Sequence, residues 1–379
     1  MMILFSTVRC FTANLTGHRP VRYEIILRDW DLLKAYIVNI MTQNMLRKRI
    51  AIDLGTANTL VWVAGEGLIA NEPTVVAISA EDSKVIAVGE EAKLMLGRTP
   101  EALIASRPMR EGVIADYQVT EAMLRYFIGK VVGRFQLFRP DVMICVPAGC
   151  TQVERRAALD ATLAAGAAHA YLIDEPLAAA IGAGIPVSAP SGHMIVDIGG
   201  GSSEAAVISL GGVVVHKSVR VAGNKIDEAI QDYLKKKHNL IVGDQTAEEI
   251  KIKIGSATKV AKEEKIEISG RDLVFGLPRS IVILSKEVTV AIQGTLMQII
   301  GVVKGVLEDT PPELAADIID KGIVMSGGTS TLKNFDRLLT EETGVPAHVA
   351  EDALLCVVRG TGIVMENIEL WKRSVMTRR

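Results

Sequence analysis

The chain has few aromatic residues and few cysteines, and neither group forms a pattern of metal ligands. Phe, Trp and Tyr together make up 4% of the 379 residues. The four cysteines (Cys10, Cys145, Cys150 and Cys356) lack the spacing of a zinc site, and the six histidines form no HxH or HExxH motif. We therefore expect no zinc site. Cysteines in apolar strands are usually buried free thiols in a reducing compartment, and that is the expectation here.

Charge and hydropathy argue against two further classes of protein. The formal net charge of −2 at pH 7 gives no support to a nucleic-acid partner that binds through bulk electrostatics. No unbroken run of about eighteen apolar residues is present, so we expect no transmembrane helix. Residues 1–5 are too short, and too poor in charge, for a signal peptide.

The first 44 residues differ in composition from the rest of the chain. They hold five of the sixteen aromatic residues and show no clean periodicity. The segment Met45-Leu-Arg-Lys-Arg49 lies directly before the first predicted strand and looks like a natural N-terminus. This favours an extension that is a non-native or mis-called start, or that is disordered. An amphipathic membrane anchor over residues 32–41 is the alternative.

Gly, Ala, Val and Ile are abundant, and 49% of the chain is hydrophobic. This composition favours an α/β protein with buried strands and closely packed helices. The length is sufficient for two domains.

Two short segments share one construction, Asp53-Leu-Gly-Thr-Ala-Asn-Thr59 and Asp197-Ile-Gly-Gly-Gly-Ser-Ser203. Each lies between two apolar runs, which predicts a strand, a glycine turn and a second strand, with an aspartate ending the first strand. Glycine lets the backbone approach a ligand, and turn N–H groups with small hydroxyls bind anions. A carboxylate beside such a turn suits a hydrated Mg²⁺ ion. A single turn of this kind is more often a simple hairpin, but two facing turns would hold a polyphosphate from both sides.

The chain divides into two halves that both begin with a β-hairpin and place helices later. Residues 186–192 contain two prolines and a glycine and are the best boundary. This order suggests an internal duplication with a cleft between the halves. We predict a first lobe at 45–189 with 359–379, containing a subdomain at about 77–109, and a second lobe at 190–358, containing a subdomain at about 226–289.

Four motifs occur in an order that resembles the actin, sugar-kinase and heat-shock-chaperone ATPase superfamily. They are Asp53-x-Gly-Thr, Glu175-Pro-x-Ala-Ala-Ala, Asp197-x-Gly-Gly-Gly and Ser326-Gly-Gly328. Further segments, among them Asn71-Glu-Pro73, Val153-Glu-Arg-Arg156 and His348-Val-Ala-Glu-Asp352, resemble the MreB family of bacterial actin homologues. The similarity extends over residues 45–367.

This resemblance implies an actin-like ATPase fold: two duplicated lobes of mixed sheet with flanking helices around a nucleotide cleft, each with a smaller subdomain. It implies a cell-shape-determining protein that binds ATP and Mg²⁺, hydrolyses ATP slowly and forms paired protofilaments. Such filaments would lie in the cytoplasm at the inner face of the cell membrane. There they would organise cell-wall synthesis in rod-shaped cells, together with membrane-embedded elongation proteins.

The resemblance also assigns roles to residues. Asp53 and Asp197 would hold Mg²⁺ through water, and Glu175 would orient the attacking water. The residues expected at the phosphates are Thr56, Ala57, Asn58, Gly199, Gly200 and Gly201. Those expected at the adenosine are Glu248, Glu249, Ile250, Lys251, Gly327, Gly328, Thr329 and Ser330.

Taken alone, the weaker motifs have ordinary interpretations. Glu175 before Pro176 fits any helix start, where an acid complements the macrodipole. Glu248 and Lys251 would be a solvated helix face. The sequence departs from the family pattern at Asp174, which replaces glutamate, at Asn224, which replaces aspartate, and at Thr329, which replaces a third glycine.

Leu137 and Phe138 form an apolar pair between Arg134 and Arg139. An apolar pair flanked by cations suits insertion into an anionic membrane surface, and the MreB family carries a hydrophobic loop here. In the alternative, Phe138 folds back into the core.

Two rival functions remain within the superfamily. A sugar or acid kinase would need a base on the acceptor hydroxyl, and no extra aspartate motif indicates one. A chaperone ATPase would need a peptide-binding domain, for which we expect no room after the nucleotide domain.

Overall fold

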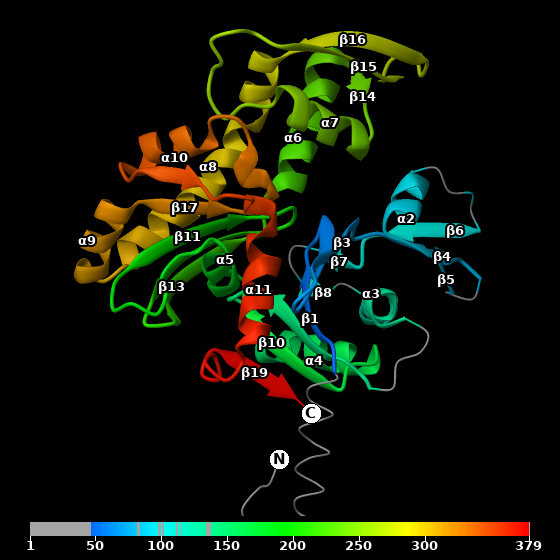
Figure 1. The fold of residues 1–379 in the computed structure, drawn as a ribbon. Helices are drawn as coiled ribbons and strands as arrows, with labels where there is room; N and C mark the ends of the chain where they lie inside the picture. Colours follow the sequence, from blue (N-terminus) through cyan, green and yellow to red (C-terminus); the bar gives the residue numbers. More distant parts are fainter. Residues whose placement is uncertain are drawn as a thin grey trace, which may run out of the picture. The chain divides into compact units, whose positions relative to one another are not determined.

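The structure is a computed structural model, and it describes residues 47–81, 84–97, 100, 102–110, 113–114, 116–133 and 138–378. Arg47–Arg379 forms one compact unit (Figure 1). The predictions for residues 1–44 and for Leu137 lie outside the described residues.

The first large sheet has six strands in the order β19-β10-β9-β1-β2-β3. β1 pairs antiparallel with β2 and parallel with β9, and β9 pairs parallel with β10. Nearly every residue of β1 and β9 is buried, as expected for strands covered on both faces. The strands are β1 (Arg49–Leu54), β2 (Asn58–Val63), β3 (Gly67–Pro73), β9 (Asp141–Val146), β10 (His169–Asp174) and β19 (Val375–Arg378).

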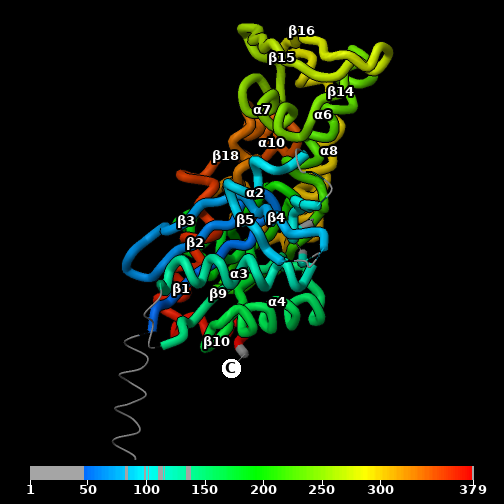
Figure 2. The backbone as a smooth tube through the Cα atoms, turned by 90° about the vertical axis from the view of Figure 1, so that its right-hand side faces the viewer, coloured from blue at the N-terminus to red at the C-terminus, as the bar shows by residue number. Residues whose placement is uncertain are grey.

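Helices cover both faces of this sheet. Ile50 and Ile52 pack in one core with Phe127 of α3 (Tyr117–Val132) and Leu159 of α4 (Gln152–Ala164). Figure 2 shows these two helices beside each other in front of the sheet. Met143, which points to the opposite face, packs in another core with α5 (Glu175–Gly182) and α11 (Cys356–Glu366).

The second large sheet repeats this arrangement. Its five strands lie in the order β13-β12-β11-β17-β18, and β11 pairs antiparallel with β12 and parallel with β17. One face of this sheet packs on α5 and α11, and the other face packs in a third core with α8, α9 and α10. The strands are β11 (His193–Ile198), β12 (Ser203–Ser209), β13 (Gly212–Val219), β17 (Ile323–Ser326) and β18 (Ala347–Val349). The helices are α8 (Ser285–Asp309), α9 (Pro312–Lys321) and α10 (Phe335–Thr343).

α5 and α11 cross between the two large sheets at a pair of glycines. A Cβ atom on Gly182 would overlap the carbonyl oxygen of Cys356, and one on Gly360 would overlap the carbonyl oxygen of Ala178. The helices can approach this closely because both positions lack a side chain.

Each half also carries a small sheet. In the first half, β4 (Val76–Ser79), β5 (Val85–Val88) and β6 (Leu103–Ser106) pack with α2 (Glu90–Met95). A two-stranded ribbon, β7 (Met109–Arg110) and β8 (Val113–Ile114), follows. In the second half, β14 (Leu240–Ile241), β15 (Lys265–Asp272) and β16 (Pro278–Leu284) lie beside α6 (Gly223–His238) and α7 (Asp244–Ile254) (Figure 1). Most of these segments overlap the predicted subdomain ranges of 77–109 and 226–289, whereas β8 lies beyond the first range and α6 begins before the second. The subdomain and lobe boundaries stay a prediction.

Among the described residues, α8 is the one helix with the length and composition of a membrane span. Polar residues interrupt its apolar stretch, so it contains no unbroken run of about eighteen apolar residues. Ile292, Leu296 and Ile300 of this helix are fully buried in the core against the second sheet. A long apolar helix of this kind is typical of a protein core as well as of a membrane.

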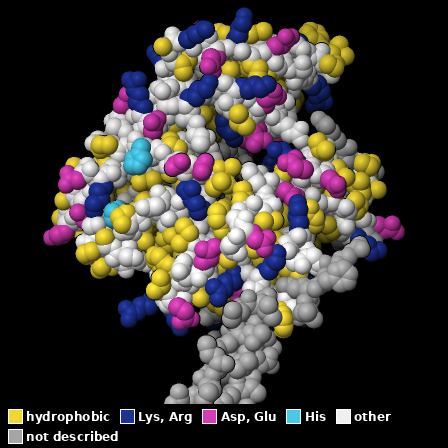
Figure 3. Space-filling view, in the orientation of Figure 1, with side chains coloured by type: hydrophobic (Ala, Val, Ile, Leu, Met, Phe, Trp, Pro, Cys, Tyr) yellow, Lys and Arg dark blue, Asp and Glu magenta, His cyan; other side chains and the backbone are white. Residues whose placement is uncertain are grey.

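On the face drawn in Figure 3, acidic and basic side chains are interspersed rather than gathered into one large patch of a single sign. This distribution agrees with the small net charge of −2. On this face, therefore, no broad basic surface of the kind that binds nucleic acid is visible.

Candidate functional site

The two aspartate–glycine turns meet in one cavity of about 640 Å³. One turn connects β1 to β2, and the other connects β11 to β12. A Cβ atom on Gly200 would lie 2.6 Å from the Cβ atom of Ala57, and one on Gly201 would overlap the Thr56 hydroxyl. The turns are therefore in direct contact, and only glycine fits at these two positions of the second turn. A cavity of this size is typical of small-molecule sites.

Asp53 and Asp197 are the second-to-last residues of β1 and β11 and lie almost fully buried beside this contact. Asp197 accepts a hydrogen bond from the Ser326 hydroxyl (2.6 Å), and Asp53 accepts one from the Cys145 thiol (3.3 Å). Burial, followed by repulsion from Asp197, raises the pKa of Asp53 to about 7. Burial raises the pKa of Asp197 to about 6, although its bond from Ser326 lowers it. Such a pair is unfavourable when both groups are ionised, and a bound cation relieves the repulsion.

Glu175 begins α5 and lines the same cavity. Ligand atoms of Asp53, Cys145 and Glu175 all lie within 4.8 Å of one another. Burial, followed by repulsion from Glu204, Asp197 and Asp53, raises the pKa of Glu175 well above its usual value. The Asp53 and Glu175 carboxyls are oxygen donors that fit a magnesium ion, whereas the Cys145 thiol is a soft donor that does not. The carboxyls present are therefore compatible with the predicted metal.

Glu204 is a buried acid that the sequence patterns do not predict as part of the site. It lies on β12 opposite Asp197 in the strand register and is 3% exposed. One carboxylate oxygen accepts a hydrogen bond from the Ala148 N–H (3.2 Å), and the other has no partner among the described residues. Burial raises the pKa of Glu204 to about 8. A glutamate inside an otherwise apolar strand was the available signal.

The other end of the cavity is formed by α7 and by the 3₁₀ helix η1 (Gly328–Thr331), which follows β17. The Thr329 hydroxyl donates to the Gly199 carbonyl (2.7 Å), so η1 is joined to the second turn. The Lys251 ammonium pairs with Asp227 (2.9 Å) and donates to the Gly223 carbonyl (3.2 Å). Thr329, one of the departures from the family pattern, therefore adds a hydrogen bond where a glycine has no side chain.

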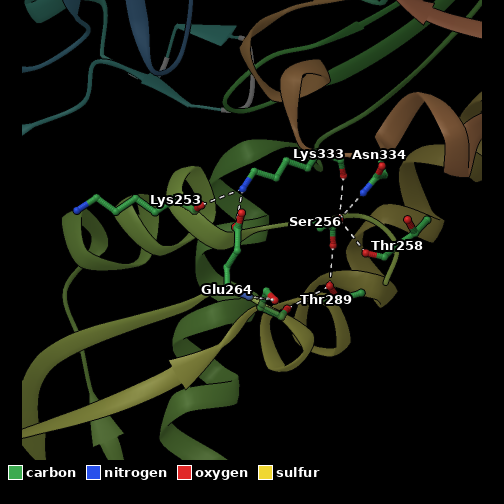
Figure 4. A network of polar contacts seen from close by, with 8 residues as sticks. Lys253, Ser256, Thr258, Glu264, Thr289, Lys333 and Asn334 are labelled. Atoms are coloured by element: carbon green, nitrogen blue, oxygen red, sulfur yellow. Dashed lines mark hydrogen bonds and ion pairs between the residues drawn. The ribbon is translucent and has the colours of Figure 1, made fainter. Parts of the chain in front are cut away.

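A polar network fixes the end of α7 relative to the segment after η1 (Figure 4). The buried Ser256 hydroxyl accepts from the Asn334 amide (2.9 Å), and the Ser256 carbonyl accepts from the Thr289 hydroxyl (3.0 Å). The Lys333 ammonium pairs with Glu264 (2.6 Å). The two elements at this end of the cavity are thus held together by side chains that do not line it.

Most of the predicted site residues line this one cavity. Glu249, Ile250 and Ser330 do not: Glu249 pairs with Lys253 on the outside of α7, Ile250 is fully buried in the core, and the buried Ser330 hydroxyl donates to the Gly327 carbonyl. Neighbouring helical residues point in different directions, so a continuous block of residues could not all face the cavity. The predicted residues in the lining are Asp53, Thr56, Ala57, Asn58, Glu175, Asp197, Gly199, Gly200, Gly201, Glu248, Lys251, Gly327, Gly328 and Thr329.

Two further predictions concern the apolar pair at Leu137 and Phe138 and the four cysteines. Phe138 is half-buried, and its predicted partner Leu137 lies outside the described residues. Cys145, Cys150 and Cys356 are free thiols, of which Cys145 and Cys150 line the cavity, whereas Cys10 is outside the described residues.

The duplicated sheets and the paired turns between them define an actin-like protein. The solved crystal structure of MreB 5 of Spiroplasma citri bound to AMPPNP superposes with a TM-score of 0.82 at 36% identity, covering 86% of this chain and 98% of that one. The MamK double helical filament is more distant, with a TM-score of 0.72 at 21% identity over 84% of this chain and 99% of that one, and shows the fold alone.

Within this class, the chain belongs to the MreB/Mbl family. The family described as MreB/Mbl protein matches residues 47–373. The chain is 48% identical over 332 residues to the cell shape-determining protein Mbl of Bacillus cereus, covering 87% of this chain and all of that protein. It is 50% identical over 333 residues to the cell shape-determining protein MreB of Escherichia coli K12, covering 86% of this chain and 96% of that protein.

Proposed function

We propose that this chain is an ATP-gated filament subunit that determines cell shape. The observation that carries the proposal is that two glycine turns, the buried carboxyls of Asp53 and Asp197 and the half-buried carboxyl of Glu175 meet in one cavity. Relatives of the chain are named cell shape-determining proteins, and MreB5 of Spiroplasma citri has been solved with AMPPNP and with ADP. We retain the lobe boundaries predicted from the sequence as part of this proposal.

In this proposal the two turns bind the phosphates of the nucleotide from opposite sides. Backbone N–H groups of Thr56, Ala57 and Asn58 bind the β- and γ-phosphates from one side, and those of residues 199–201 bind from the other. Asp53 and Asp197 would hold Mg²⁺ through its waters, and the ion would neutralise charge on the transferred phosphoryl group. Glu175, at the start of α5, orients the attacking water. Phosphoryl transfer depends mainly on positioning and electrostatics, so this set is sufficient for a slow ATPase.

The adenosine lies between η1 and α7. Backbone atoms of Gly327 and Gly328 contact the base, while Glu248 and Lys251 face the ribose. A lysine ammonium has no acceptor, so the Glu248 carboxylate is the acceptor that we propose for the ribose hydroxyls.

Assembly follows from repeated head-to-tail contacts that do not close into a ring. We propose paired protofilaments in the cytoplasm, at the inner face of the cell membrane, with cell-wall elongation proteins as membrane-embedded partners. A single apolar pair at Leu137 and Phe138 binds lipid weakly, so many subunits in one polymer would bind together.

Electron microscopy of the purified full chain on a lipid monolayer tests the proposal. With ATP and Mg²⁺ we expect paired filaments on the lipid, together with ATP-dependent pelleting. A chain that binds no ATP and forms no filaments would contradict it. ADP release that depends on an added sugar would instead favour a small-molecule kinase.

The membrane part of the proposal has a separate test. The double variant Leu137→Ser/Phe138→Ser should lose most of its co-sedimentation with anionic liposomes while still forming filaments in solution. Co-sedimentation equal to that of the unmodified chain would remove this loop from the proposal.

A further inference from the structure

Helix α2 of the first half and helix α7 of the second half are joined by a hydrogen bond and an ion pair. α2 belongs to the small sheet of the first half, and α7 belongs to the second half (Figure 1). The Gln245 amide of α7 donates to the backbone carbonyl of Lys93 in α2 (3.2 Å). The Lys93 ammonium lies 3.6 Å from the Glu248 carboxylate. These two contacts therefore join α2 of the first half to α7 of the second half.

Glu248 separates two cavities. It lines the large cavity that contains the glycine turns and also a shallower one of about 380 Å³ between α2 and α7. Ile252, one turn further along α7, does the same. The residues around the shallower cavity are Glu90, Lys93, Leu94, Gln245, Glu248, Glu249, Ile252 and Lys253.

The charges around Glu248 single out Lys93 as its partner. Lys251, on the same helix, is committed to Asp227 at 2.9 Å, and Lys253 is committed to Glu249. Among the described residues, the ion pair found for Glu248 is the one with Lys93, which comes from the opposite half. Both side chains are about one third exposed (32% and 35%), so the pair is partly screened by water and its effect is modest.

We propose that Lys93 is a positioning residue for ribose recognition: it reaches across from the first half and holds the Glu248 carboxylate at the sugar end of the nucleotide site. The inference rests on the proposed function. An unpaired glutamate on a helix surface samples several rotamers, and ordering it costs side-chain entropy when a ligand binds. A glutamate already held through one oxygen can accept hydrogen bonds from ribose hydroxyls through its remaining lone pairs at lower cost.

In this arrangement, the affinity of the site for the ribose of the nucleotide depends on how close α2 and α7 lie. When α2 and α7 separate, Glu248 loses Lys93, and its hold on the ribose weakens. By thermodynamic linkage, a nucleotide that uses Glu248 must in turn favour the arrangement in which α2 and α7 are close.

The test compares Lys93→Met with Lys253→Met in the full chain, using ATP and 2′,3′-dideoxy-ATP as probes. Methionine retains the aliphatic stem of the lysine and leaves its backbone carbonyl available to Gln245. Lys253 lies around the same cavity but pairs along its own helix, so it is the matched control.

We expect Lys93→Met to weaken equilibrium binding of ATP about two- to fivefold, the size of a partly exposed ion pair. Binding of 2′,3′-dideoxy-ATP, which has no ribose hydroxyls, should be unchanged. Lys253→Met should leave both affinities unchanged, and Lys93→Arg should restore the preference for ATP.

An equal loss for both nucleotides, or no loss for either, would overturn the role of Lys93. This failure is distinguishable from failure of the proposed function, because in the latter case the unmodified chain would bind neither nucleotide. Thermal melting of each variant without nucleotide shows whether it is folded.

Discussion

The Glu175 carboxyl lines the cavity but belongs to neither glycine turn. Replacing it with alanine removes the group proposed to orient water and leaves the phosphate-binding backbone intact. For Glu175→Ala we expect ATP binding and filament formation to persist, while phosphate release slows by about 10²-fold. Equilibrium binding and a phosphate-release assay measure the two properties separately. Loss of ATP binding would show that the assigned role is wrong.

Residues of the site were predictable where a local pattern carried the information. Asp53 and Asp197 each end an apolar run before a glycine turn, and the repetition of this construction pointed to one shared site. Glu204 is not predictable in this way, because a single acid within a strand is also typical of a solvent-facing position. Lys93 could not be found at all, since its pairing with Glu248 depends on how two distant helices pack.

Ile250 and Ser330 are two predicted binding residues that do not line the cavity. Both side chains are fully buried away from it. The periodicity of α7 turns Ile250 into the core while Glu248 and Lys251 face the cavity. A residue-level prediction therefore needs the helical phase as well as the motif.

Among the elements, the crossing of α5 and α11 depends most directly on residue size. A methyl group on Gly182 would overlap the Cys356 carbonyl, so the helices would have to move apart. We expect Gly182→Ala to lower the free energy of unfolding by about 3 kcal/mol, at the upper end of overpacking effects. Urea denaturation followed by circular dichroism measures this change.

Gly294→Ala is the matched control for that variant. Gly294 lies inside α8, is exposed, and has no atom within 4 Å of the position its Cβ would occupy. Alanine there should stabilise the protein by about 0.5–1 kcal/mol because it favours the helix. Equal effects of the two substitutions would contradict the close helix crossing.

The order of helices and strands along each half could be predicted from the sequence, whereas the pairing of strands that are far apart in the chain could not. Apolar runs and turn residues indicated the two opening hairpins, which the structure contains as β1–β2 and β11–β12. The pairing of the last strand, β19, with β10 had no local signal, since it joins segments far apart in the chain. Strand order in a sheet is decided by such distant packing.

For the whole molecule, the buried carboxyls predict how stability without nucleotide depends on pH. The pKa values of Asp53, Asp197 and Glu204 are raised to about 7, 6 and 8. The folded chain therefore binds more protons than the unfolded chain between about pH 4 and pH 8, so stability falls as pH rises through this window. Within this window His193 acts in the opposite direction, because burial lowers its pKa. The carboxyls whose pKa is lowered, Glu154, Asp272, Glu287 and Asp317, also act in the opposite direction, but they titrate at or below the acidic end of the window.

We accordingly expect the nucleotide-free protein to melt at a lower temperature at pH 8 than at pH 6. Mg²⁺ with ATP should reduce the difference, since the cation offsets the repulsion between ionised carboxylates. Glu204→Gln should flatten the pH dependence without nucleotide. A melting temperature that rises from pH 6 to pH 8 would contradict the electrostatic description of the site.

The central claim is that the two aspartate–glycine turns bind one Mg–nucleotide between them. Calorimetric titration of ATP with Mg²⁺ into the full chain and into Gly201→Val tests this most directly. A side chain at Gly201 would overlap Thr56 of the facing turn and force the two turns apart. We predict one ATP bound per unmodified chain and no detectable binding to Gly201→Val, with circular dichroism showing that the variant is folded. Equal affinity of the two proteins for ATP would contradict the claim.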